Sequence, residues 1–164
     1  MEIKFLKIKT LATETVRGKV RFMSCERLFS GTDDFLRFSN NTDYGMLESN
    51  AKDKGIDIAY VQLLMAFSHW TYEISKTELM VVDLQGIITR SETGGRTVLL
   101  TDPAIHCKDL TRYGQMNLGE DGMANFFSRH ACNNFCRLFS LKRDILARKS
   151  DRGLVVSLLF ISVT

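Results

Sequence analysis

The segment Ser128–Phe139 reads SRHACNNFCRLF and places three soft metal ligands, His130, Cys132 and Cys136, within seven residues. A closed structural zinc site takes four nitrogen or sulfur donors in a tetrahedron, so this cluster predicts a fourth ligand from elsewhere in the chain. On a helix, Cys132 and Cys136 share one face because they are four residues apart. In the alternative interpretation, the two cysteines pack as small hydrophobes and His130 is solvated.

Few residues outside this segment can supply the fourth ligand, because the chain has only three histidines and four cysteines in all. His69, in the sequence AFSHWTYE, is the best candidate, and the alternative is a hydrogen-bonded core histidine beside Trp70. His106 and Cys107 form a weaker alternative pair of ligands. A metal suits the closely spaced cysteines better than a disulfide does, which favours a reducing, cytosolic protein.

The composition is that of an ordinary globular domain. The chain has 164 residues, 45% of them hydrophobic and 25% charged, and a formal net charge of +3. So small a charge gives no reason to expect a nucleic-acid partner. The N-terminal residues MEIKFLKIKT do not resemble a signal peptide. The apolar run LVVSLLFISV (154–163) is shorter than the ~20 residues that span a bilayer, so we expect a buried strand or a non-native end, and no membrane span.

The length of the chain favours one domain, and hydrophobic periodicity and turn residues predict both strands and helices in it. The expected elements are a small sheet over 3–28, a connection rich in Gly, Asn, Asp and Ser over 30–55, a helix over 58–72, a strand over 78–88, a strand over 97–100 and a helix over 120–139. Glu120 and Asp121 suit the positive end of that last helix.

Two acidic motifs could carry chemistry. Asp83 and Gln85 are two residues apart, so on a strand their side chains point to the same face and can share a metal or orient a hydroxyl group. Asp102, in TDP, follows the next strand and could complete an oxygen-rich magnesium site. The alternative is that these strand-end acids are turn formers.

A glycine-containing loop, YGQMNLGEDG (113–122), precedes the last predicted helix. Its backbone N–H groups, around Gly114, Asn117 and Gly119, could bind phosphate or a peptide. As a lone motif it is more typical of a flexible loop with a helix cap.

Five motifs in this order resemble the atypical alpha-type protein kinases, the group that contains myosin heavy chain kinase and elongation-factor-2 kinase. They are AFSHWTYE (66–73), LMVVDLQG (79–86), LTDPAIH (100–106), GQMNLGEDG (114–122) and FFSRHACNNFC (126–136). The resemblance runs from about Glu26 to Leu141. It implies an α+β kinase-like catalytic lobe that is held together by structural zinc and that transfers the ATP γ-phosphate to a serine or threonine of a protein substrate.

The resemblance also implies roles for individual residues. Asp83 would be the catalytic acid that orients or deprotonates the substrate hydroxyl, and Gln85 and Asp102 would hold Mg²⁺ on the ATP phosphates. Glu26 would be the hinge glutamate near adenine. The residues of the Gly114–Gly119 loop, Asn117 among them, would lie at the peptide substrate.

The same resemblance implies four zinc ligands, His69, His130, Cys132 and Cys136, and so names the fourth ligand. It divides the chain into a reduced N-terminal lobe and hinge over 1–28, a C-terminal lobe over 29–141 and an unmatched tail over 142–164. We expect a cytoplasmic protein that binds ATP and a protein substrate, with further domains in a longer native chain.

One departure from the family pattern supports an alternative function. The family's N-terminal lobe carries a glycine-rich loop and a lysine that contacts ATP, both upstream of the position of Glu26. None of Lys4, Lys7, Lys9 or Lys19 lies in a motif that matches this lysine. The alternative is therefore a zinc-stabilised pseudokinase or interaction module that does not bind ATP.

Overall fold

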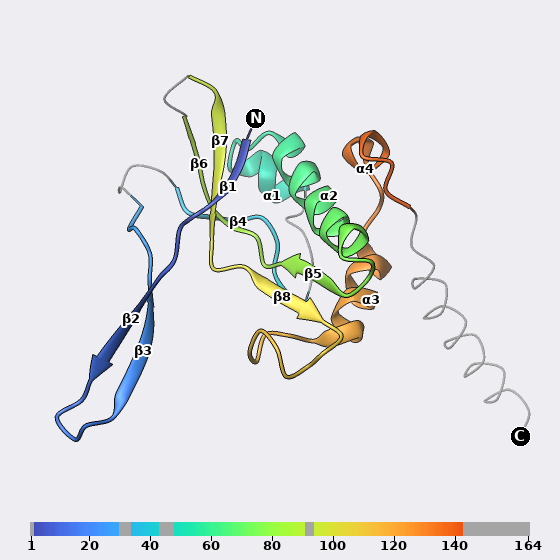
Figure 1. The fold of residues 1–164 in the computed structure, drawn as a ribbon. Coiled ribbons are helices and arrows are strands. Elements are labelled where there is room, and N and C mark those ends of the chain that lie inside the picture. Colours follow the sequence, from blue (N-terminus) through green and yellow to red (C-terminus); the bar gives the residue numbers. More distant parts are fainter. Residues whose placement is uncertain (1, 30–33, 43–47, 91–93, 143–164) are drawn as a thin grey trace, which may run out of the picture. The chain divides into compact units, whose positions relative to one another are not determined.

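The computed structural model describes residues 2–29, 34–42, 48–90 and 94–142. Contacts within the chain form two compact units, residues 1–36 with 85–101 and residues 37–84 with 102–164 (Figure 1). The division into 1–28, 29–141 and 142–164 rests on family correspondence instead and stays a prediction. The apolar run at 154–163 lies outside the described residues.

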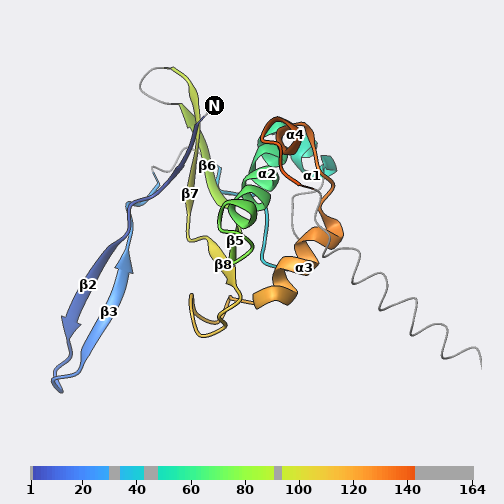
Figure 2. The ribbon, with the colours of Figure 1, turned by 45° about the vertical axis from the view of Figure 1, so that its right-hand side comes forward.

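The first unit is built from strands. Its elements are β1 (Glu2–Phe5), β2 (Lys9–Glu14), β3 (Val20–Cys25), β6 (Gln85–Arg90) and β7 (Arg96–Thr101), and β4 (Leu36–Arg37) lies at its boundary. β7 pairs in parallel with β1 and antiparallel with β6, and the sheet order is β1-β7-β6-β4. β2 and β3 form a separate antiparallel hairpin, seen as a two-stranded ribbon in Figure 2. The expectation of strands over 3–28 is therefore confirmed.

The second unit combines helices with a two-stranded sheet. Its elements are α1 (Glu48–Asp53), α2 (Ile58–Ile74), β5 (Leu79–Val82), β8 (Ala104–Cys107), α3 (Gly119–Arg129) and α4 (Asn134–Leu138). β5 pairs antiparallel with β8, α2 packs against β5, and α3 packs against β8. α4 lies beside α2 in both views (Figures 1 and 2). Side chains such as Leu64, Met80 and Phe126 are fully buried here and form the core.

The helix expected over 58–72 is confirmed and extends to Ile74. The Asp57 carboxylate accepts a hydrogen bond from the Ala59 N–H and so caps the N-terminus. At the other end, the Ser75 hydroxyl donates to the Tyr72 carbonyl. The apolar side chains of this helix lie all round its axis rather than on one face. Such a helix takes its stability mainly from packing against its neighbours.

The prediction of a single strand over 78–88 is wrong, because the strand is interrupted at Asp83 and Leu84. Asp83 has a φ of +53°, in the left-handed region that interrupts a ladder. β5 ends before it and β6 begins after it, and the two strands belong to different sheets. Asp83 and Gln85 therefore do not lie on one strand.

Two further expectations need correction. The connection over 30–55 contains β4 and α1 among its described residues. The last helix is not continuous, because α3 ends at Arg129 and the extended backbone of His130 leads into a separate helix, α4. The Asn133 side chain accepts hydrogen bonds from the N–H groups of Phe135 and Cys136 and starts that helix.

Candidate functional site

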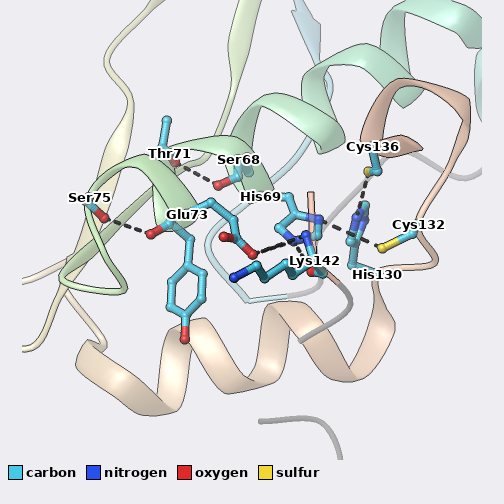
Figure 3. A network of polar contacts seen from close by, with 10 residues as sticks. Ser68, His69, Thr71, Glu73, Ser75, His130, Cys132, Cys136 and Lys142 are labelled. Atoms are coloured by element: carbon cyan, nitrogen blue, oxygen red, sulfur yellow. Dashed lines mark hydrogen bonds and ion pairs between the residues drawn. The ribbon is translucent and has the colours of Figure 1, made fainter. Parts of the chain in front are cut away.

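Four side chains converge in the second unit, His69 from one part of the sequence and His130, Cys132 and Cys136 from another (Figure 3). The ligand atoms of His69, His130, Cys132 and Cys136 all lie within 4.8 Å of one another. His69 comes from α2 and Cys136 from α4, whereas His130 and Cys132 lie in the extended link between α3 and α4. Cys132 and Cys136 thus meet without sharing a helical face, contrary to the expectation from their spacing.

Two distances between these ligand atoms are close to those around a tetrahedral zinc ion. Cys136 Sγ lies 3.4 Å from His130 Nε2, and Cys132 Sγ lies 3.9 Å from His69 Nδ1. Zinc bonds of about 2.0–2.3 Å in a tetrahedron place neighbouring ligand atoms roughly 3.3–3.8 Å apart. Burial, together with neighbouring His69, lowers the pKa of His130 to about 4, so its ring is neutral at pH 7 and has a lone pair for a metal.

Aromatic packing and one asparagine hold this cluster in place. The His130 ring stacks on Phe126 with the ring centroids 4.9 Å apart, and His69 meets the edge of Phe127 at 5.0 Å. Asn133 caps α4 through its carbonyl oxygen and donates through its amide group to the Gln62 carbonyl of α2, at 2.8 Å. Asn133 therefore fixes α4, and with it Cys136, against the helix that carries His69.

His106 does not take part in the metal cluster. Its Nδ1 accepts a hydrogen bond from the Leu118 N–H, which leaves Nε2 to donate to the Asn41 carbonyl. Burial lowers the pKa of His106, consistent with this neutral form. The alternative pair His106 and Cys107 is therefore not a metal site in the described part of the chain.

Asp83 occupies the tight connection between β5 and β6. Its Oδ1 lies 3.6 Å from Arg37 Nε. Burial raises the pKa of Asp83, while the Arg37 charge opposes this rise and the Asp102 charge adds to it. Asp102 itself has a φ of +43° and occupies the equivalent connection between β7 and β8. The two predicted carboxylates therefore lie close enough for the charge of Asp102 to influence Asp83.

Hydrogen bonds from Phe38 and Ser39 fix the residue that follows Asp83. The Ser39 hydroxyl accepts from the Leu84 N–H at 2.9 Å, and the N–H groups of Phe38 and Ser39 both donate to the Leu84 carbonyl. Sequence reasoning missed Ser39 and Arg37 because it treated their segment as an unstructured connection. The only signal was the polar run SNNT beside an aromatic residue.

Glu26 and Gln85 belong to the first unit. Gln85 is buried and pairs with Thr101, whose hydroxyl donates to the Glu26 carboxylate. This unit contains a cavity of about 780 Å³ with Glu26 in its wall. Its lining combines apolar and cationic side chains, including Phe5, Leu28, Ile87, Lys7 and Arg90.

The loop before α3 is organised by Asn117. Its side-chain oxygen accepts from the N–H groups of Cys107 and Gly119, and its amide nitrogen donates to the carbonyls of Asp109 and Arg112. Asn117 is buried, so its polar groups are used within the loop. Gly114 and Gly119 both have positive φ values, which glycine adopts at little cost.

Comparison with known proteins places this architecture in a family. The model of the alpha-kinase family matches residues 1–136. The chain therefore belongs to the alpha-kinase family, as its motifs indicated.

Individual relatives agree. The chain is 46% identical over 133 residues to alpha-protein kinase vwkA of Dictyostelium discoideum, a match that covers 79% of this chain and 19% of vwkA. It is 44% identical over 87 residues to eukaryotic elongation factor 2 kinase of Mus musculus, which covers 52% of this chain and 11% of that kinase. The chain thus spans a fifth or less of these relatives.

Solved structures show the same fold. The apoenzyme alpha-kinase domain of myosin-II heavy chain kinase A matches with a TM-score of 0.68 and 28% identity, over 88% of this chain and 50% of that domain. The domain of myosin heavy chain kinase A in complex with AMPPCP matches with a TM-score of 0.63 and 29% identity, over 85% of this chain and 47% of that domain.

Among the described residues, no helix combines the length and apolar character needed to cross a membrane.

Proposed function

We propose that this chain is part of a cytoplasmic alpha-type protein kinase that transfers the γ-phosphate of ATP to a serine or threonine hydroxyl of a protein substrate. The observation that carries the proposal is Asp83, a buried carboxylate clamped in a left-handed turn between Arg37 and Asp102, in a chain of the alpha-kinase family. Four free cysteines are consistent with a reducing compartment. Further domains are expected in a longer native protein.

Asp83 would act on the substrate hydroxyl as the group that orients it and accepts its proton. Burial raises the pKa of the Asp83 carboxyl, which strengthens it as a base, and Arg37 favours the ionised form that a base needs. Gln85 and Asp102 would hold Mg²⁺, which neutralises phosphate charge when bound. The three residues then perform the positioning and charge neutralisation on which phosphoryl transfer mainly depends.

Glu26 would lie near the adenine base of the bound nucleotide. It lies in the wall of the first unit's cavity, where apolar side chains such as Ile87 suit a planar base and cationic side chains suit phosphates. The Gly114–Gly119 loop, braced from inside by Asn117, would present its outer surface to the protein substrate. Tyr113 and Met116 are exposed on this loop.

His69, His130, Cys132 and Cys136 would hold a structural zinc ion. The site offers four protein donors and no open position, which is typical of structural rather than catalytic zinc. Its binding energy would be folding energy for the second unit.

The kinase proposal is tested by phosphate transfer from radiolabelled ATP to a basic peptide in the presence of Mg²⁺. We expect Asp83→Asn to lower the rate by about 10²–10⁴-fold, the usual contribution of a positioned base. Asp53→Asn makes the same chemical change at an exposed position of α1 and should leave the rate unchanged. Full activity in Asp83→Asn contradicts the role given to Asp83.

The alternative function is a zinc-stabilised pseudokinase or interaction module. It is supported by the complete metal cluster together with the lack of a matched ATP-contacting lysine among residues 2–29. It predicts stabilisation by zinc but no thermal shift with Mg²⁺ and ATP. A magnesium-dependent rise in melting temperature on adding ATP favours the kinase.

A further inference from the structure

The two ring nitrogens of His69 face different partners. Nδ1 lies 3.9 Å from Cys132 Sγ, on the side of the candidate metal, whereas Nε2 lies 2.9 Å from the backbone carbonyl oxygen of Lys142 (Figure 3). A carbonyl oxygen can only accept a hydrogen bond, so Nε2 must carry the proton. The neutral ring then has its lone pair on Nδ1, where a metal would bind.

A carboxylate holds the peptide group that sets this tautomer. Glu73 lies one helical turn after His69 on the same face of α2. Its Oε1 accepts a hydrogen bond from the Lys142 N–H at 3.2 Å and lies 3.9 Å from His69 Nε2. Lys142 is thus bound to α2 through both its N–H and its carbonyl group.

The residue before Lys142 is tied to the other side of the cluster. The Leu141 N–H donates to the carbonyl of Cys136 at 2.9 Å. Two consecutive residues therefore connect the helix of one metal ligand to the helix of another. The segment Leu141–Lys142 closes the cluster on the side of His69 away from Cys132.

We propose that Glu73 and the Lys142 backbone are positioning groups of the zinc site. They fix His69 as the Nε2–H tautomer, and zinc binding in turn anchors the chain at Lys142 to the C-terminal half of α2. Histidine ligands generally require such a partner on their second nitrogen, and its loss typically costs about 10–100-fold in metal affinity. This inference rests on the proposed zinc site and is independent of kinase activity.

The first experiment assigns the metal-bound nitrogens in the unmodified full chain. Long-range ¹H–¹⁵N correlation NMR of the zinc-loaded protein should show His69 bound through Nδ1 with a slowly exchanging Nε2–H, and His130 bound through Nε2. Zinc binding through His69 Nε2 overturns the proposal while leaving the zinc site intact. A chain that takes up no zinc refutes the zinc site and this inference together.

The second experiment removes the partner. Glu73→Ala should lower zinc affinity about 10–100-fold in competition with a chromophoric chelator and speed the exchange of His69 Nε2–H. Lys142→Pro removes the N–H that Glu73 binds and should act in the same direction. Glu78→Ala is the matched control, because this exposed carboxylate pairs with Lys108, away from the cluster, and should not change affinity.

Glu73→Gln separates positioning from folding. Its side-chain oxygen can still accept the Lys142 N–H, so most of the zinc affinity should return if Glu73 acts by position. The proposal is overturned if Glu73→Ala and Lys142→Pro bind zinc as tightly as Glu78→Ala does. If Glu73→Ala does not fold, Glu73→Gln alone decides. Exchange of His69 Nε2–H at the wild-type rate and unchanged zinc affinity in Glu73→Gln support the proposal. Fast exchange of His69 Nε2–H in Glu73→Gln contradicts it.

Discussion

Replacing Gly122 by alanine should destabilise the second unit through a single methyl group. Gly122 is buried in α3 with an ordinary helical backbone, and a Cβ built there would lie 2.6 Å from His106 Cδ2 and 2.7 Å from His106 Nε2. The imidazole would have to move, and its hydrogen bonds to Asn41 and Leu118 would weaken. Any helix former at this position meets the same obstacle.

We expect a net loss of about 2 kcal/mol in the free energy of unfolding. Overpacking typically costs about 1–3 kcal/mol and a weakened hydrogen bond about 1 kcal/mol, while the better helix propensity of alanine returns about 1 kcal/mol. For a chain of this size the melting temperature should fall by roughly 4–8 °C.

Urea and thermal denaturation at saturating zinc measure the effect of Gly122→Ala. Glu120→Ala alters the same turn of α3 at an exposed position and should cost only a few tenths of a kcal/mol, about the value of a charge at a helix N-terminus. In a His106→Ala background the space is empty, so Gly122→Ala should then be neutral or stabilising. If Gly122→Ala alone is as stable as the unmodified chain, the contact with His106 does not limit this position.

Three further perturbations follow from the structure. Asn133→Ala removes the cap of α4 and its bond to Gln62, and should cost about 1–3 kcal/mol in urea denaturation, with a loss below about 0.5 kcal/mol counting against it. Asp83→Asn should stabilise the chain at neutral pH, because burial raises the pKa of Asp83 and folding then disfavours its ionised form. The gain in the free energy of unfolding should grow as pH rises through and above the ordinary carboxyl range, and it should vanish below that range. A gain that does not depend on pH contradicts a raised pKa for Asp83. Removing zinc with a chelator, or the change Cys136→Ser, should lower the melting temperature strongly, and a metal-free protein that melts normally would remove the zinc site.

The sequence predicted the elements whose side chains repeat with a clear period. The spacing of Val61, Leu64 and Met65 indicated α2, and the ligand types at His69 and Cys136 indicated the cluster that the structure assembles. These signals are strong because burial and metal chemistry restrict the residue types at each position.

Local backbone breaks could not be predicted in the same way. Nothing in the apolar run around Asp83 distinguishes a strand interrupted by a left-handed residue from a continuous one, since the interruption depends on pairing with distant strands. Asn133 is compatible with a helix interior at small cost, so its role as a cap emerges only when α4 packs on α2. Ser39 binds Leu84 from 45 residues away, and the polar run SNNT does not indicate which residue Ser39 binds.

The register of β6 and β7 has a consequence for how this protein can vary. The ladder runs from Gln85 opposite Thr101 to Arg90 opposite Arg96, and the acids lie close to its first pair in sequence, Asp83 two residues before Gln85 and Asp102 one residue after Thr101. Residues can be gained or lost between Arg90 and Arg96 without changing the separation of either acid from that pair. Natural length variation, or an inserted peptide tag, is therefore best accommodated between Arg90 and Arg96 in the sequence.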